Sequence, residues 1–424
     1  MKFTSTRSDI TVTLSTALKQ GIAPDGGLYV PTELPTYTVD DFTSIDDLNQ
    51  IAKSFLAPFF SDDNLEKMLD QICEETFSFP IPLRELPTGS HILELFHGPT
   101  GAFKDVGARF LAQCLSKIED NLLVLVATSG DTGSAVAASF YRQSGVQVII
   151  LYPKDKISEF QEKQLTFWDE NVLTLRIRGD FDKCQQLVKL AFHDQRRKQK
   201  YGLTSANSIN IGRLLPQCVY YVQASLQYYR QYGKAPNLII PTGNMGNALA
   251  AIWVKQMGLP ISHIWMATNE NTSIPEYFAS GEYHPQPSIA TLANAMDVGD
   301  PSNMERYLHL VEKNQEIEKE IFAVSVSDEH IAESITEMSK SGVNVCPHTA
   351  TAVYVQQKYK IEDAILIATA DPFKFKSIVS KYSVLGVEPS AVLRPYLDSA
   401  IHVTEIPADL EELFNQIERF REYS

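Results

Sequence analysis

The chain has 424 residues, of which 44% are hydrophobic and 21% are charged, and its net charge at neutral pH is −15. This composition is typical of a globular protein with a sizeable core and argues against general disorder. The acidity argues against nucleic acid as a partner and against an anionic membrane surface, because both attract basic proteins. A small anionic ligand is compatible with it if the ligand site is locally positive.

No apolar run approaches the roughly 18 residues of a membrane-spanning helix, and the first residues lack the apolar centre of a signal peptide. The five cysteines are odd in number and form no C-x-x-C pair, so we expect reduced, buried thiols. The nine histidines are scattered singly, and we expect no metal site. Together these features predict a cytoplasmic protein.

Turn signals interrupt the first part of the chain, among them Pro24 to Gly27 and Pro80 to Pro82. Helical patterns lie between them, around residues 46–57 and 62–76. We therefore predict an N-terminal domain over residues 1–90 that lies against a larger body.

A strand–turn–helix–strand pattern follows. The apolar run 122–127 leads through a Gly-rich turn to a helical stretch, Ser134 to Gln143, and then to a second apolar run, 146–151. Short continuous apolar runs are typical of strands buried on both faces, and their alternation with helices indicates a parallel sheet.

The pattern recurs with a strand at 237–241, a Gly-rich turn from Thr242 to Asn247 and a further helix, and buried strands are expected at 263–268 and 364–369. The fold class is therefore α/β. In such sheets ligands bind beyond the carboxyl ends of the strands, which is where both Gly-rich turns and Thr369 fall.

The turn from Thr242 to Asn247 is the strongest candidate for binding a phosphate. It leaves a buried strand and enters a helix, so unpaired N–H groups and the positive end of the helix can face an anion. An ordinary tight connection would look the same, and the shape alone does not decide. The chain has no G-x-G-x-x-G and no G-x-x-x-x-G-K-[ST] sequence, which argues against a dinucleotide site and a nucleotide P-loop.

Two further segments carry groups that bind anions. The turn from Thr128 to Ser134 offers hydroxyls and small residues at a helix start, although a simple helix cap would use the same residues. The segment from Ser205 to Arg213 places amides and hydroxyls ahead of an arginine, which suits bidentate recognition of phosphate or carboxylate. An exposed arginine after a helix cap is the simpler interpretation of this segment alone. Two Gly-rich turns on one sheet favour a ligand with two anionic ends.

Lys104 is a candidate nucleophile. It follows Gly, Pro, Ala and Phe residues in the segment from Phe96 to Asp105 and precedes a helical pattern. A lysine at a helix start is usually solvated, but burial among these neighbours would lower its pKa and make its amine reactive.

Five segments, in this order, resemble the threonine synthases, pyridoxal-phosphate enzymes of the tryptophan-synthase β-like fold. They are LELFHGPTGAFKD (93–105), ATSGDTGSA (127–135), NSINIGR (207–213), PTGNMGN (241–247) and ATADPFKF (368–375). The segment QGIAPDGGLYVP (20–31) resembles the N-terminal domain of that family, which related dehydratases and cysteine synthases lack. The resemblance implies a fold-type II enzyme with parallel-sheet domains: a large cofactor-binding domain over 91–105 and 201–424, and a small domain over 106–200.

The resemblance also implies the site. Lys104 resembles the lysine that holds pyridoxal 5'-phosphate as a Schiff base and serves as general base. Thr369 matches the hydroxyl that meets the pyridine nitrogen. The loop that holds the cofactor phosphate matches Gly243, Asn244, Met245, Gly246 and Asn247. The positions that bind the phosphate and carboxylate of the substrate match Thr132, Asn207, Ser208 and Arg213.

Asp131 matches the position that faces the phenolic oxygen of the cofactor, where many relatives of this fold have Asn. A carboxylate beside a phenolate would repel it unless one of the two is protonated. The sequence offers no account of how this chain would accommodate the acid.

The resemblance implies a carbon–oxygen lyase that converts O-phospho-L-homoserine and water to L-threonine and phosphate, the last step of threonine biosynthesis. Closure of the small domain would exclude water from the site. One alternative is a phospho-lyase that releases 2-oxobutyrate from the same substrate, and another is a non-catalytic binding protein of this fold. A serine or threonine dehydratase would leave Arg213 and the N-terminal domain unexplained. Chains of this extended type lead us to expect a monomer.

Overall fold

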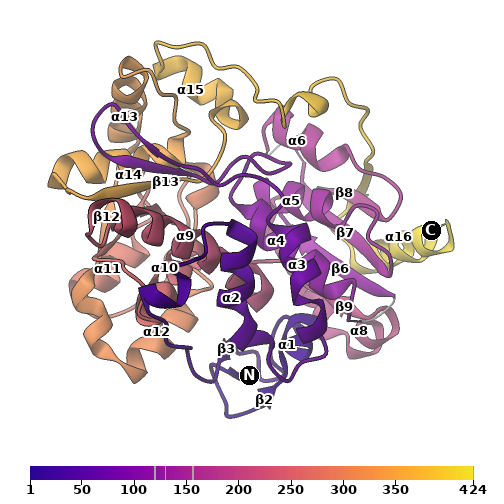
Figure 1. Ribbon diagram of the computed structural model, residues 1–424. Helices are drawn as coiled ribbons and strands as arrows, with labels where there is room; N and C mark the ends of the chain where they lie inside the picture. Colours follow the sequence, from indigo (N-terminus) through magenta and orange to yellow (C-terminus); the bar gives the residue numbers. More distant parts are fainter. Residues whose placement is uncertain (119–120, 129, 155–156, 424) are drawn as a thin grey trace.

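The computed structural model describes residues 1–118, 121–128, 130–154 and 157–423. Within them the chain forms three sheets, one for the N-terminal part and two for the body (Figure 1). Ser129, which belongs to the first Gly-rich turn, lies outside the described residues. The predicted α/β class with parallel sheets and an N-terminal domain is confirmed.

The N-terminal sheet is antiparallel, in the order β2–β1–β3. Its strands are β1 (Phe3–Ser5), β2 (Thr11–Val12) and β3 (Tyr29–Pro31), followed or interrupted by the helices α1 (Leu14–Gln20), α2 (Leu48–Phe60) and α3 (Leu69–Thr76). The helix predicted at 46–57 begins after Asp47, whose carboxylate accepts the N–H of Gln50. The helix predicted at 62–76 begins later, because Asp62 has a positive φ of 62° and a 3₁₀ turn precedes α3.

The larger body sheet has the order β12–β11–β10–β13–β5–β4. The first five strands are parallel and β4 is antiparallel to β5. The strands are β12 (Ile321–Ser325), β11 (Ile264–Thr268), β10 (Asn237–Pro241), β13 (Ala364–Ala368), β5 (His91–Glu94) and β4 (Leu83–Glu85). The strand predicted at 237–241 is confirmed at both ends, and those at 263–268 and 364–369 are each one residue shorter. The helices of this part include α9 (Leu215–Tyr232), α10 (Gly246–Gln256), α11 (Ser273–Ser280), α12 (Met304–Lys313), α13 (Asp328–Lys340), α14 (Pro347–Tyr359) and α15 (Lys376–Tyr382).

The second body sheet is parallel throughout, in the order β14–β8–β7–β6–β9. Its strands are β14 (Thr404–Pro407), β8 (Val172–Arg178), β7 (Val146–Pro153), β6 (Leu122–Ala127) and β9 (Leu203–Thr204). The helices in this stretch are α4 (Lys104–Leu115), α5 (Asp131–Phe140), α6 (Glu159–Thr166), α7 (Phe181–His193) and α8 (Gln195–Tyr201), and α16 (Leu410–Tyr423) ends the chain. The helix predicted at 134–143 begins at Asp131, because the Thr128 hydroxyl accepts the N–H groups of Gly130 and Gly133 and holds the turn before it.

The domain ranges stay a proposal, and the structure changes one of them. Residues 404–424 were predicted in the large domain, but β14 pairs with β8 in the smaller sheet, and α16 contributes Leu413 to the same core. Figure 1 shows α16 beside β7 and β8. The sequence did not predict this pairing, because β14 has only four residues, three of them exposed, and so lacks the apolar run that marks a buried strand. We propose that the small domain is completed by the last residues of the chain.

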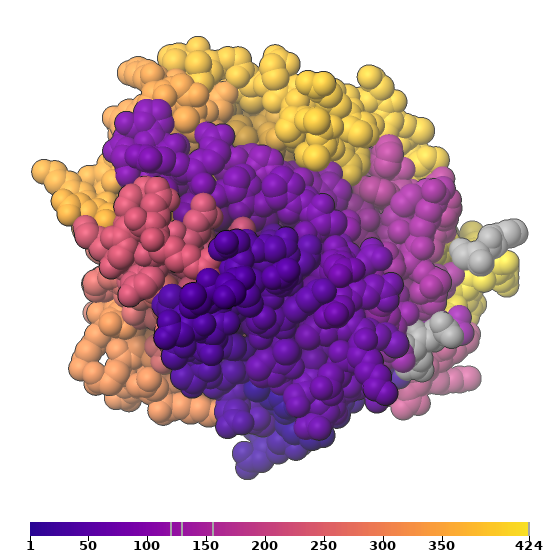
Figure 2. Space-filling view, viewed as in Figure 1, coloured from indigo at the N-terminus to yellow at the C-terminus, as the bar shows by residue number. Residues whose placement is uncertain are grey.

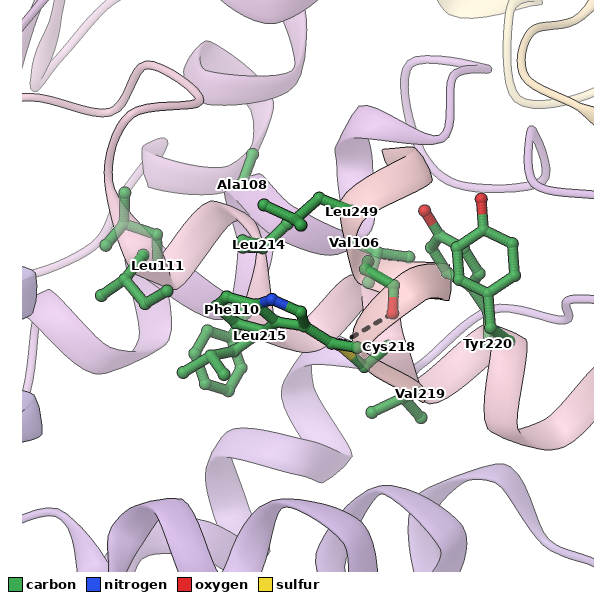
Figure 3. Close-up of a cluster of buried hydrophobic side chains, with 14 of the residues drawn as sticks. Val106, Ala108, Phe110, Leu111, Leu214, Leu215, Cys218, Val219, Tyr220 and Leu249 are labelled. Atoms are coloured by element: carbon green, nitrogen blue, oxygen red, sulfur yellow. Dashed lines mark hydrogen bonds between the residues drawn. The ribbon is translucent and has the colours of Figure 1, made fainter. Parts of the chain in front are cut away.

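The core joins the three parts through α4. Figure 3 shows Val106, Phe110 and Leu111 of α4 facing apolar side chains of α9 and α10. Phe110 also meets Phe60 of α2 edge-on, with 6.0 Å between the ring centroids. Since α4 begins at Lys104, this packing sets the position of that lysine. The N-terminal residues, indigo to purple, cover much of the face in Figure 2.

The five cysteines are free and buried, as expected of structural thiols. Among the described residues, no helix combines the length and the apolar character that crossing a membrane requires.

Replacing Phe110 with Ala tests the role of α4 in the core. Phe110 is fully buried, so Phe110→Ala should lower the free energy of unfolding by about 3–5 kcal/mol, measured by urea denaturation followed by circular dichroism. Val384 is 62% exposed, and Val384→Ala should change stability by no more than about 0.5 kcal/mol. Equal effects of the two changes would contradict the assignment of Phe110 to the core.

Candidate active site

A short backbone pairing places Lys104 at the end of the large sheet. Ala102 forms an antiparallel bridge with Ala370, just beyond β13. The N–H of Phe103 donates to the carbonyl of Thr369 at 2.8 Å. Lys104, the next residue, is the first of α4. The structure thus brings the predicted nucleophile beside the predicted strand-end hydroxyl.

Asp105 holds the loop that carries Lys104. Its buried carboxylate accepts the N–H of Thr100 at 2.9 Å and the hydroxyl of Thr100 at 2.6 Å. Burial raises the pKa of Asp105, against these hydrogen bonds. Gly98 is required nearby, because a Cβ there would lie 2.6 Å from the Asp105 Oδ2 atom. The acid next to Lys104 is therefore part of the loop's internal structure.

The surroundings of Lys104 favour a neutral amine. Burial lowers the pKa of Lys104, and the charges of Arg213 and Lys374 lower it further, while Asp131 acts in the opposite direction. A lysine with a lowered pKa can act as a nucleophile at neutral pH. Arg213 and Lys374 thus place two cationic side chains close to Lys104, in a protein whose net charge is −15.

Asp131, the first residue of α5, forms a buried ion pair that the sequence did not indicate. Its Oδ1 atom lies 3.2 Å from the Nζ of Lys374, and both side chains are at least 95% buried. Burial alone would raise the pKa of Asp131, but Lys374 first, and then Lys104, lower it to about 2. Asp131 is therefore a carboxylate at neutral pH. The only available signal was Lys374 itself, which lies between two phenylalanines much as Lys104 follows one.

The second Gly-rich turn has the shape of an anion site. Met245 has a left-handed backbone with φ of 59°, and α10 begins at Gly246. The first N–H groups of a helix have no partner within it, so those of α10 can face a ligand. Gly243 lies against the chain at Met296, where a Cβ would come within 2.7 Å of a backbone atom.

Asn247 differs from the other residues of this turn, because its side chain is already used. Its Oδ1 atom accepts the Thr242 hydroxyl at 2.8 Å and the Ala248 N–H at 2.9 Å. Its Nδ2 group donates to the Pro241 carbonyl at 2.8 Å. The Asn247 side chain therefore shapes the turn, and only its backbone N–H is available to a ligand there.

The segment predicted to bind the substrate lies next to this turn. The Asn244 amide donates to the Ser208 hydroxyl at 2.5 Å. Arg213 is buried, which lowers its pKa to about 10, and its Nε atom has no hydrogen-bond partner among the residues that the structure describes. The Asn207 Oδ1 atom is likewise buried without a partner. Buried polar atoms are almost always satisfied, so these two point to a ligand. Thr132 is placed only by its position after Asp131 in the first turn of α5.

Two more buried groups near the site gave no sequence signal. The N–H of Ala295 donates to His348 Nε2 at 3.1 Å, and burial lowers the pKa of His348 to about 4. Arg306, on α12, is also fully buried, and burial lowers its pKa to about 9. It donates to three carbonyls from two segments, Tyr29 O at 2.9 Å, Ser208 O at 3.4 Å and Ile209 O at 2.6 Å, and to the side chain of Asn303, at 2.7 Å from its Oδ1 atom. Both side chains face partners distant in sequence, which a pattern of residues does not reveal.

Comparisons with known proteins identify the class. A sequence model described as pyridoxal-phosphate dependent enzyme matches residues 78–368. The crystal structure of threonine synthase from Escherichia coli superposes with a TM-score of 0.91 at 36% identity, covering 99% of this chain and 100% of that one. A pyridoxal-phosphate-bound threonine synthase from Brucella melitensis gives a TM-score of 0.92 at 30% identity, covering 99% of each chain. Fold and site thus define a pyridoxal-phosphate dependent enzyme.

The narrower assignment rests on the whole length of the chain. A second model, described as threonine synthase N terminus, matches residues 2–77. A threonine synthase from Serratia marcescens is 39% identical over 412 residues, covering 95% of both proteins. The Escherichia coli threonine synthase is 38% identical over 411 residues, again covering 95% of both. The chain belongs to the threonine synthase family.

The residues present fit the cofactor of this family. Lys104 supplies a buried amine of lowered pKa for an aldehyde, and the start of α10 supplies free N–H groups for a phosphate. The unpartnered Nε–H group of Arg213 is a donor left for a further anionic group, whereas the Asn207 Oδ1 atom is an acceptor and would take a donor of the ligand.

Asn247→Ala should weaken cofactor binding, because the turn loses the hydrogen bonds that shape it. We expect the Kd for pyridoxal 5'-phosphate to rise about tenfold, equivalent to ~1.4 kcal/mol, in an absorbance titration of the cofactor-free chain. Asn415→Ala, on the exposed side of α16, is the matched control and should leave the Kd unchanged. An unchanged Kd for Asn247→Ala would show that the side chain does not support the phosphate turn.

Proposed function

We propose that this chain converts O-phospho-L-homoserine and water to L-threonine and phosphate, with Lys104 carrying pyridoxal 5'-phosphate. One observation carries the proposal beyond the family assignment. The amine of lowered pKa lies close enough to the buried Arg213 for the charge of the arginine to act on it, the Arg213 Nε atom has no hydrogen-bond partner among the described residues, and the turn before α10 contacts Ser208 in the segment that precedes this arginine. A substrate with a phosphate at one end and a carboxylate at the other matches that distribution of positive groups.

Each predicted residue has a proposed task. Lys104 would hold the cofactor through its Nζ atom, and Thr369 would meet the ring nitrogen at the end of β13. The cofactor phosphate would lie in the turn of Gly243, Asn244, Met245, Gly246 and Asn247. The two anionic groups of the substrate would be bound by Thr132, Asn207, Ser208 and Arg213. Asp131 would contact the cofactor ring from the side of α5.

The bound cofactor supplies an electron sink that stabilises negative charge on the carbons of the amino acid. Lys104 is then the base that removes the α-proton, and burial, which lowers its pKa, favours the neutral amine that can accept a proton. Arg213 and the neighbouring substrate-binding residues would hold the two anionic groups of the substrate in place while the phosphate leaves the γ-carbon. The buried walls of the site exclude bulk water until one molecule attacks the β-carbon.

The remaining properties are proposals of the same kind. We infer that the enzyme acts in the cytoplasm on a small anionic amino acid, as a monomer and without nucleic acid. The net charge of −15 supports the last point, because a nucleic-acid site requires a basic surface.

The reaction is tested by incubating the purified holoenzyme with O-phospho-L-homoserine and measuring phosphate, threonine and 2-oxobutyrate together. We expect one threonine for each phosphate, and a loss of at least about 10²–10⁴-fold in Lys104→Ala. Lys376→Ala, an exposed lysine beyond the site, is the control and should keep full activity. Phosphate accompanied by 2-oxobutyrate would instead establish the phospho-lyase, and bound cofactor without any phosphate release would refute this substrate.

Arg213→Lys tests the anion contact while keeping the charge. Lysine lacks the planar fork of donors, so kcat/KM for O-phospho-L-homoserine should fall about 10- to 100-fold, mainly through KM. The exposed Arg394→Lys should have no effect. A normal KM in Arg213→Lys would place the arginine outside the substrate site.

A further inference from the structure

Lys374 occupies a position from which it touches three parts of the site. It lies in a 3₁₀ turn after β13, Pro372–Phe375, and its side chain is fully buried. Its Nζ donates to the Thr100 carbonyl at 2.6 Å and to Gln164 Oε1 at 2.7 Å, and it lies 3.2 Å from Asp131 Oδ1. An ammonium group has three donors, so all three are used, one in the Lys104 loop, one on α6 and one on α5.

Asp131 is surrounded by groups from four elements. Lys374 pairs with it, Gln161 of α6 donates to its Oδ1 atom at 3.3 Å, and the charge of Lys104 acts on it from α4. His348 of α14 also faces it, but a pKa of about 4 leaves this histidine neutral at neutral pH. Among the described residues, the cations that act on the charge of Asp131 at neutral pH are therefore Lys374 and Lys104.

We propose that Lys374 is a positioning residue, whose ammonium neutralises Asp131 so that Lys104 is held as a neutral amine. The inference rests on the proposed role of Lys104 as the residue that carries the cofactor. This role of Lys374 explains how the fold accommodates a carboxylate at position 131, because Lys374 is a buried counter-ion for Asp131.

The charges of Lys374 and Asp131 determine whether removing either one raises or lowers the pKa of Lys104. Without Lys374, the buried carboxylate of Asp131 would have Lys104 as its remaining cationic partner, and an unpaired buried charge is strongly unfavourable. The ammonium form of Lys104 would be stabilised and its pKa would rise. Without Asp131, the ammonium of Lys374 would act on Lys104 unopposed and its pKa would fall. Removing both charges cancels the two effects.

The test follows the ionisation of Lys104 in the cofactor-free chain. The rate at which pyridoxal 5'-phosphate attaches is measured by absorbance as a function of pH, and only the neutral amine reacts. We expect the midpoint of this profile to move up by about one pH unit or more in Lys374→Gln and down in Asp131→Asn. The double variant should return close to the unmodified chain. Lys376→Gln, two residues away and exposed, is the control and should not move the midpoint.

A second measurement separates this inference from the role of Lys104. Competitive acetylation of the cofactor-free chain, read by mass spectrometry, reports the ionisation of Lys104 whether or not the cofactor attaches. Failure of attachment with the expected acetylation shifts would refute the cofactor role but keep the charge balance. If Lys374→Gln does not fold, Asp131→Asn is compared with the double variant instead. The proposal then requires the pH midpoint of the double variant to be higher than that of Asp131→Asn. Coincident profiles for the unmodified chain, Asp131→Asn and the double variant would overturn the proposal.

Discussion

The hydrogen bonds that join residues 101–103 to residues 369–371 are the constraint on which the site depends. They attach the loop before α4 to the segment beyond β13 and so place a helix start at the carboxyl end of the large sheet. The other end of α4 is held by its packing against α2 and α9. Lys104 is thus positioned by one backbone pairing and one apolar interface.

The electrostatics of the site follow from its burial. Cations collect there in a chain of strongly negative net charge, because an anionic substrate and cofactor need positive surroundings. The groups that face one another in the interior are Lys104, Lys374, Arg213, Asp131 and Asp105. The Asp105 carboxylate accepts hydrogen bonds from its own loop, and the Asp131 carboxylate forms an ion pair with Lys374. Arg213 is then the cation of this group that remains for an anionic ligand, and a buried cation without a ligand carries a desolvation penalty.

The sequence predicted those parts of the structure that are local. Strands at 122–127 and 237–241 were found because a short apolar run bounded by turn residues has few alternatives in an α/β chain. The helix at 62–76 was placed too early, because the 3₁₀ turn before α3 shares its composition. The resemblance to a family supplied the positions of Lys104 and of the phosphate turn, which spacing alone left undecided.

The sequence did not predict the interactions between residues that are far apart in the chain. Lys374 lies in one of the segments that resemble the family, residues 368–375, but its proposed role depends on Asp131, which is more than two hundred residues earlier in the chain. Arg306 reads as one charge on an amphipathic helix until the fold buries it beneath the chain at Tyr29 and Ile209. The resemblance assigned Asn247 to the turn that holds the cofactor phosphate, and the structure adds that its side chain forms hydrogen bonds within that turn. A pattern of residue types identifies the groups but not their partners.

The placement of β14 has a consequence for the order in which the molecule forms. Ribosomal synthesis delivers β6, β7 and β8 long before the strand that covers the exposed edge of β8. During that interval the nascent sheet presents an unpaired parallel edge, the kind of surface that invites pairing between chains. The strand that pairs with this edge, β14, is synthesised only with residues 404–407, and the apolar face of α16 follows it. The small sheet is therefore completed only when residues 404–423 have been synthesised, and a chain truncated near residue 400 would keep that edge open.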